Sequence, residues 1–363
     1  MIAHAPFPGS YRDGDVDFLL RRLPQQDFTD VAEKEALIQS GQRHYSQMLS
    51  PEAAPSARYM RLFDAACAAN NPRMAQDCLR LAGLIAGRRA QQVTIVSLAR
   101  AGTPVGVVVA RLLRERFGRD AVHYCVSIVR DRGIDTAALR HILAQGHAPG
   151  SIVFVDGWTG KGVIARELAG SVDAFNARHG VAIDAGLYVL SDLAGAAACA
   201  ASCDDYLIPS SILNATVSGL VSRTVIPDDL SQDEFHGCVF YADFAGIDRS
   251  QTFADDLTAL ALAADIAETQ PVNTQAARER SQTYLGAAMR HYGVADVNLV
   301  KPGIGEATRV LLRRVPRLLV LRNADAPDVA HLAALAEEKQ VPVDIDPSLP
   351  YHAVSLIRSA SDG

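Results

Sequence analysis

Short apolar runs alternate with amphipathic stretches through most of this chain. Residues 93–98, 123–129, 152–155 and 186–190 are rich in apolar side chains and have the length of buried strands. Between them, apolar residues recur at helical spacing, as in 104–117. Strands that alternate with helices predict an α/β fold with a doubly wound parallel sheet.

The flanking segments have different patterns. Residues 1–40 begin with several Pro and Gly residues and contain few apolar residues at regular spacing, so we expect an N-terminal arm. Residues 56–88 contain two helical patterns, and Asn71-Pro72 is expected to open the second because Pro favours the first helical turn. Pro, Asp and Gly interrupt short apolar pieces in 209–275, which predicts an irregular hood beside the sheet.

A second, smaller unit follows the hood. Strand and helix patterns restart after residue 293, which predicts a small C-terminal α/β domain. The expected organisation is an N-terminal arm (1–40), a sheet domain with its hood (41–275), a linker helix (276–292) and the C-terminal domain (293–363).

Composition narrows the classes of function. Apolar residues make up 49% of the 363 and charged residues 21%, which is typical of a soluble globular protein. The net charge of −6 argues against general nucleic-acid binding, so any such binding needs a local basic patch. No apolar run approaches the roughly 20 residues of a membrane span, and the N-terminus lacks a secretion signal. The six Cys residues show no zinc-ligand spacing, and a reducing cytoplasm is the expected location.

The stretch 151–164 carries the clearest chemistry. An apolar strand ends at Asp156, and a Gly-rich turn then leads into a new helix. Backbone N–H groups in such a turn bind anions, and an acid at the strand end can hold a sugar hydroxyl or, through water, Mg²⁺. The candidate phosphate-binding residues are Gly157, Thr159, Gly160, Lys161 and Gly162. The alternative is a tight strand-to-helix turn with no ligand.

Two further turns fall at the same sheet edge. The first follows strand 93–98, where the small residues Ala99, Ala101 and Gly102 let backbone amides approach an anion. The guanidinium group of Arg100 can add two parallel charged hydrogen bonds to the same anion. The second carries Arg130 and Arg132. Three such turns at one edge predict a site for a phosphorylated, ribose-like ligand.

The turn after Asp156 resembles the phosphoribosyl-pyrophosphate (PRPP) loop of type I phosphoribosyltransferases. Asp156 matches the first acid of that motif and Thr159-Gly160-Lys161 its phosphate turn, while Gly157 stands where a second acid is usual. The resemblance implies an enzyme that displaces pyrophosphate from PRPP with a nitrogen acceptor, or the reverse, with Mg²⁺ as cofactor. It implies catalytic roles for Asp156, Arg100, Arg130 and Arg132. A non-catalytic sensor of PRPP or a nucleotide remains the alternative.

Residues 301–309 resemble the helix start of Pelota-type RNA-binding domains. Between 301 and 322 the chain has six Lys or Arg and one acid, a local net charge of +5. Gly305 stands where that family has a base-contacting Asn. The resemblance implies that structured RNA is contacted by Lys301, Gly303, Glu306, Arg309, Arg313 and Arg314. The alternative is a basic helix face on a docking domain.

Together the two units resemble a bacterial family of tellurite-resistance and stress gene clusters, whose members are often labelled StiP-type cysteine proteases. Residues 42–52 are similar to its N-terminal signature, and His44, Tyr45 and Glu52 are candidates for the acceptor side, although His44 could equally cap a helix.

A cysteine protease needs a thiolate, a nearby His and an oxyanion hole. The candidate pairs are His123 with Cys125 and His236 with Cys238. Neither Cys is placed by the sequence at a helix N-terminus, which would lower its pKa. We therefore expect a phosphoribosyltransferase in preference to a protease, and the sequence leaves a homo-oligomeric state open.

Overall fold

A six-stranded parallel sheet, the main sheet, forms the centre of the computed structural model, which describes residues 5–24, 29, 31–265 and 272–358. All its neighbouring strands run parallel, as the sequence predicts. In spatial order they are β1 (Asp17–Phe18), β4 (Asp120–Val126), β3 (Gln92–Leu98), β7 (Ile152–Thr159), β8 (Leu187–Asp192) and β9 (Cys199–Ser202).

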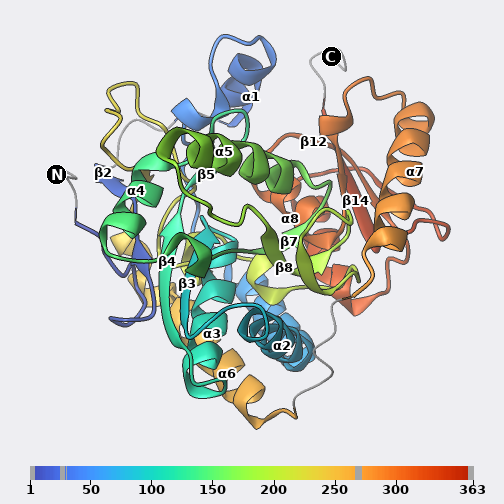
Figure 1. Cartoon of the computed structure of the whole chain (residues 1–363). Coiled ribbons are helices and arrows are strands. Elements are labelled where there is room, and N and C mark those ends of the chain that lie inside the picture. Colours follow the sequence, from blue (N-terminus) through green and yellow to red (C-terminus); the bar gives the residue numbers. More distant parts are fainter. Residues whose placement is uncertain (1–4, 25–28, 30, 266–271, 359–363) are drawn as a thin grey trace.

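Helices cover both faces of the main sheet, so the predicted α/β doubly wound architecture is confirmed (Figure 1). One face packs on α2 (Ala57–Ala86), α3 (Gly102–Glu115) and α6 (Ser250–Ala263). The other face packs on α4 (Thr136–Ala144) and α5 (Val163–His179). The strands between them read as continuous apolar runs because both of their faces are buried.

Helix α2 is a single element, whereas the sequence predicts two helices divided at Pro72. Pro72 lies inside the helix and removes one backbone hydrogen bond, at a cost of roughly 3 kcal/mol. Apolar residues on both sides of it, from Phe63 to Ile85, are buried in the same core. Burial of that shared face outweighs the local cost and keeps the helix continuous.

The N-terminal segment is built into the sheet domain. Strand β1 forms the edge of the main sheet, and β2 (Arg21–Leu23) pairs with β10 (Gly237–Val239) of the hood. Phe18 is fully buried, and Asp15 forms a buried ion pair with Arg111 of α3 at 2.6 Å. The N-terminal segment, which the sequence predicts to be an arm, therefore contributes to the core of the sheet domain.

The remaining elements of the first unit are short. They are α1 (Val31–Gln39), the antiparallel pair β5 (Ile128–Val129) and β6 (Gly133–Ile134), and the 3-10 turns η1 (Tyr45–Gln47), η2 (Pro149–Ser151), η3 (Pro209–Ser211), η4 (Ala215–Val217) and η5 (Ala242–Ile247). The last three turns lie in 209–275, the segment expected to form an irregular hood, which also contains β10 and the regular helix α6.

The C-terminal domain contains a mixed four-stranded sheet in the order β11-β14-β12-β13. Residues 297–299 form the 3-10 turn η6, and the first strand of this sheet starts at Val300. The elements are α7 (Gln275–Tyr292), η6 (Val297–Leu299), β11 (Val300–Pro302), α8 (Ile304–Arg313), β12 (Pro316–Leu321), η7 (Pro327–Val329), α9 (Ala330–Glu338), β13 (Val343–Ile345) and β14 (Ala353–Ile357).

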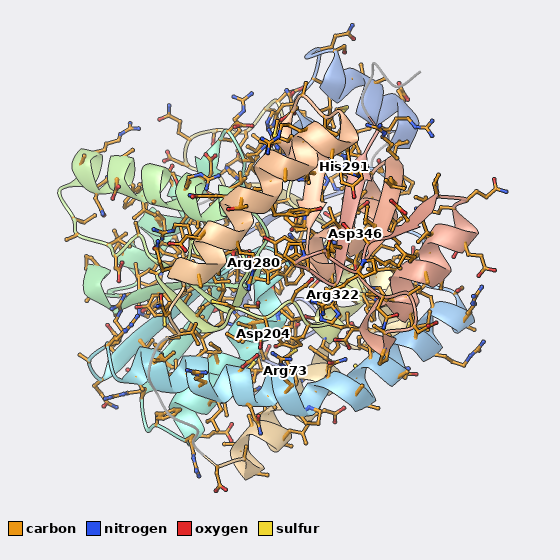
Figure 2. The ribbon with its side chains drawn as sticks, turned by 90° about the vertical axis from the view of Figure 1, so that its right-hand side faces the viewer. Arg73, Asp204, Arg280, His291, Arg322 and Asp346 are labelled. Carbon is orange, nitrogen blue, oxygen red and sulfur yellow. The ribbon has the colours of Figure 1, made fainter. Side chains whose placement is uncertain are left out.

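The segment after β9 joins the two domains. Asp205 accepts hydrogen bonds from the backbone N–H of Ile304 (2.9 Å) and of His352 (2.7 Å). Figure 2 shows the adjacent Asp204 beside Arg73 of α2, an ion pair of 2.5 Å between exposed side chains. Within the described residues, no helix is both long and apolar enough to cross a membrane.

Candidate active site

A cleft lies between the main sheet and the C-terminal domain. It sits beyond the carboxyl ends of β3 and β7, where ligands bind in open parallel sheets, and α8 forms the opposite wall. The cleft has two lobes with cavity volumes of about 190 and 300 Å³. Asp156, Trp158, Arg309 and Arg313 line both lobes, so the two spaces adjoin.

The two lobes differ in their walls. The hood lobe is closed by Ser210, Ser211, Asn214 and Arg223. The loop lobe is formed by the turn 159–162 after β7, together with residues of β11 and α8. The two predicted sites, one for phosphate and one for RNA, therefore face each other across a single cleft.

Most residues selected from the sequence meet in this cleft. Those that line it are Ala99, Arg100, Ala101, Arg130, Asp156, Thr159, Gly160, Lys161, Gly162, Lys301, Glu306, Arg309, Arg313 and Arg314. Four other selected residues, all in the described part of the chain, do not line it: Gly102, Gly157, Gly303 and Arg132. Gly102 opens α3 and packs against the backbone of Val155, and Arg132 lies on an exposed depression nearby.

Polar side chains of the turn after β7 are hydrogen-bonded to other parts of the protein. The hydroxyl of Thr159 donates to Asp192, which also accepts from the backbone N–H groups of Ala196 and Ala197. Lys161 donates to the carbonyl of Val297, and burial lowers the pKa of Lys161 to about 7. The turn is therefore held against the C-terminal domain.

Arg100 is also engaged. One terminal nitrogen pairs with Glu52 at 2.5 Å, and the other donates to the carbonyl of Val221 at 2.7 Å. The guanidinium fork expected to bind phosphate is thus directed at the protein, while its Nε has no partner among the described residues.

Asp156 is buried at the end of β7. Its carboxylate accepts from the backbone N–H of Gly157 at 2.8 Å. Burial raises its pKa to about 6, although Arg309 acts in the opposite direction. Among the described residues, no group of three or more His, Cys, Asp or Glu side chains could hold a metal ion. The expected Mg²⁺ beside Asp156 stays a prediction.

Helix α8 turns its predicted RNA-binding face toward the first domain. The guanidinium of Arg309 stacks on the ring of Trp158 at 4.4 Å and donates to Glu306 at 2.8 Å. A Cβ on Gly305 would overlap the same Trp158 ring, and one on Gly160 would meet Glu306 at 2.6 Å. Gly305 is thus required for close packing of the two domains at this point.

Several residues that line the cleft are not among the candidates selected from the sequence. Trp158, Arg223 and Asn214 are examples, and Asn214 accepts from Arg313 at 2.8 Å. The hood residues lie far from both loops in sequence and reach the cleft only through the tertiary fold. Of the three N-terminal candidates, Tyr45 lines both lobes.

The other two N-terminal candidates have structural roles. His44 caps the 3-10 turn η1, which is one of its two predicted roles. Glu52 contributes to the site through its ion pair with Arg100.

A thiol lies directly behind the cleft. Cys125 of β4 is in register with Ser97 of β3, and its Sγ lies 3.2 Å from the hydroxyl of Thr103 in the first turn of α3. Ser97 Oγ lies 2.7 Å from His123 Nε2, and His123 Nδ1 lies 3.0 Å from the carbonyl oxygen of Asp15. We call Cys125, Ser97 and His123 the thiol relay.

The hydrogen bonds fix the tautomer of His123. A carbonyl oxygen only accepts, so Nδ1 carries the proton and Nε2 accepts from the hydroxyl of Ser97. Burial raises the pKa of Cys125 to about 12, and the neighbouring hydroxyls of Thr103 and Ser97 act in the opposite direction. Burial lowers the pKa of His123 to about 3, so the relay is neutral.

The position of Cys125 corrects a sequence-based expectation. The sequence places no helix N-terminus beside this residue, but the fold brings the start of α3 against it, because Thr103 contacts Cys125 across 22 positions of the chain. Helix N-termini favour thiolates. Gly106 permits this approach, because a Cβ there would overlap His123.

No other cysteine in the described part of the chain has such an arrangement. Cys238 is buried near Cys125, and burial raises its pKa. His236, the predicted partner of Cys238, instead lies 2.8 Å from Ser127 through Nδ1. Cys67 and Cys203 are half-buried, and burial raises their pKa to about 12 and about 11.

Two family models match the chain. Residues 9–258 match the tellurite-like stress resistance cysteine protease StiP, and residues 279–359 match the PELOTA RNA binding domain. The chain belongs to the StiP family. It is 43% identical to a protein of Acinetobacter baylyi named cysteine protease StiP, over 100% of this chain and 97% of that protein.

These matches overturn the expectation of a phosphoribosyltransferase and the preference for it over a cysteine protease. The local structure gives physical reasons. The Thr159 hydroxyl and the Arg100 fork are bonded within the protein, and Gly157 leaves Asp156 without the second acid of the PRPP motif. A strand, an acid and a Gly-rich turn therefore do not establish sugar-phosphate transfer.

Proposed function

We propose that this protein is a thiol-dependent peptidase with Cys125 as the nucleophile. Family membership supports the class of reaction. The observation that carries the residue assignment is the position of Cys125 beside Ser97 on the neighbouring strand, where the Ser97 hydroxyl is hydrogen-bonded to an imidazole of defined tautomer.

In the proposed mechanism, the proton of Cys125 reaches His123 through the hydroxyl of Ser97. Ser97 accepts the proton of Cys125 and passes its own hydroxyl proton to Nε2 of His123, which leaves a thiolate and an imidazolium. The thiolate attacks the peptide carbonyl, and the imidazolium returns a proton through Ser97 to the leaving amine as the C–N bond breaks. Water then hydrolyses the thioester. The carbonyl of Asp15 orients His123 throughout.

The proposal includes an opening step. The relay lies behind the turn 99–102, whose residues Ala99, Arg100 and Ala101 line the cleft. Displacement of this turn would admit water and substrate to Cys125. Hydration removes the burial that keeps Cys125 and His123 neutral, so thiolate formation is coupled to opening.

The test is proteolysis of an unstructured protein such as casein by the full chain. Cys125→Ala removes the nucleophile, and we expect activity to fall by about 1000-fold or more. Cys238→Ala is the matched control, because it removes a nearby buried thiol and should retain activity. Equal melting temperatures would establish that both variants are folded. Full activity in Cys125→Ala would overturn the assignment.

A second proposed function is RNA binding by the C-terminal domain, supported by its match to the PELOTA model. Arg317 and Arg322 follow α8 but do not line the cleft, which makes them candidates for phosphate contacts. Arg317→Gln with Arg322→Gln should weaken hairpin-RNA binding and reduce its salt dependence. Unchanged binding and salt dependence would reject this surface. Arg178→Gln on α5 is the exposed control.

A further inference from the structure

The cleft concentrates positive charge in an enclosed space. Eight of its described lining residues are Lys or Arg, against two acids, Asp156 and Glu306. Burial lowers the pKa of Arg313 well below its usual value, and the neighbouring Arg100 and Arg309 lower it further. Burial also lowers the pKa of Arg223 to about 10. Enclosed like charges disfavour one another, so this arrangement favours an anion.

The hood lobe adds a second, independent observation. The hydroxyls of Ser210 and Ser211 and the Nε of Arg100 are buried without a hydrogen-bond partner in the described part of the chain. Each of these three residues is more than nine-tenths buried. Buried polar groups are nearly always satisfied in folded proteins, so three in one lobe indicate that a ligand supplies their partners.

Shape and composition limit the ligand. Cavities of about 190 and 300 Å³ together suit a small molecule. The packing of Gly305 on Trp158 leaves no room for an RNA helix on this face of α8. Tyr45, Trp158 and Ile164 line both lobes and provide aromatic and apolar surface between the charged walls.

We infer that the cleft binds a small molecule carrying two phosphate groups, which both domains hold together. Lys161 and Lys301 supply charge in the loop lobe, and Arg223 supplies charge in the hood lobe, where the Nε of Arg100 is a further donor. Arg313 lies between the lobes, so α8 serves this ligand. The inference concerns binding alone, and it stands apart from the proposed peptidase.

Calorimetric titration of the full chain with inorganic pyrophosphate tests the inference. Pyrophosphate should bind at least about tenfold more tightly than orthophosphate, because its two groups engage more cations. Arg313→Gln should weaken pyrophosphate at least about tenfold, while Arg178→Gln should leave its affinity unchanged. The melting temperature of ligand-free Arg313→Gln should change little, because relief of repulsion among neighbouring cations offsets the loss of hydrogen bonds to Asn214.

Three results would overturn the inference. They are no binding of pyrophosphate, equal affinity for pyrophosphate and orthophosphate, and unchanged affinity in Arg313→Gln. Displacement of pyrophosphate by a hairpin RNA whose binding also depends on Arg313 would assign the cleft to RNA instead. Peptidase activity of Cys125 is measured separately, so the failure of either proposal leaves the other testable.

Discussion

The thiol relay and the cleft are neighbours along the chain, because Ser97 belongs to the relay and Ala99, Arg100 and Ala101 line the cleft, yet the two regions differ in burial, charge and hydrogen bonding. The relay is buried and neutral, and its imidazole is hydrogen-bonded at both ring nitrogens. The cleft is rich in cations, and it contains buried polar groups without partners among the described residues. The proposed ligand binding therefore requires no change from this structure, whereas the proposed peptidase reaction requires movement of the turn 99–102.

Removal of the Ser97 hydroxyl should produce the largest difference between the two regions, because it affects the relay and leaves the cleft unchanged. Ser97→Ala breaks the path between Cys125 and His123, and we expect peptidase activity to fall by about 100-fold or more. Pyrophosphate affinity should not change. Thr94→Val is the matched control, because Thr94 lies in the same strand and bonds Ser151 instead. Proteolysis rates and calorimetry check both expectations, and equal activity in the two variants would refute the relay.

The cleft depends on domain docking, which the relay does not use. Asp205→Ala leaves the N–H groups of Ile304 and His352 without their acceptor, so we expect the free energy of unfolding to fall by about 2–3 kcal/mol. Asp204→Ala is the neighbouring control. It removes an exposed ion pair to Arg73 and should cost less than about 1 kcal/mol. Urea unfolding measures both, and equal losses would contradict the docking role.

The close packing at Gly305 can be tested in the same way. Gly305→Asn restores the residue that the RNA-binding motif has at this position but forces a side chain into the ring of Trp158. We expect a loss of about 1–3 kcal/mol from overpacking and weaker pyrophosphate binding. Stability equal to that of the unchanged chain would show that α8 does not pack on Trp158 in solution.

A smaller effect should appear in the pH dependence of the cleft. Burial lowers the pKa of Lys161 to about 7, with Lys301 and Arg130 adding to the decrease and Glu306 and Asp296 opposing it. A bound anion raises that pKa, so binding takes up a proton and weakens as pH rises above about 7. Asp156, with a pKa of about 6, is already ionised in this range.

Sulfate is the suitable probe because it does not titrate near neutral pH. Its affinity should fall several-fold between about pH 7 and about pH 8.5, and Lys161→Met should flatten this profile. Lys339→Met, outside the cleft, should retain it. A flat profile in the unchanged chain would exclude Lys161 as the responsible group.

The sequence predicted the sheet well because its strands are uniformly apolar and separated by helical periodicity. It predicted most of the cleft because strand ends in a parallel sheet share one edge. It did not reveal Arg223 or Asn214, which reach the cleft from the irregular hood. It also missed the helix start beside Cys125, since only the tertiary fold brings Thr103 to that thiol.

The proposed nucleophile can be tested most directly by labelling with a peptidyl electrophile followed by peptide mapping. The reagent requires both peptide recognition and a reactive thiolate, so exposure alone does not favour a cysteine. We predict a single adduct on Cys125 that is lost in Ser97→Ala. An adduct on Cys67 or Cys203, with Cys125 unmodified, would contradict the account.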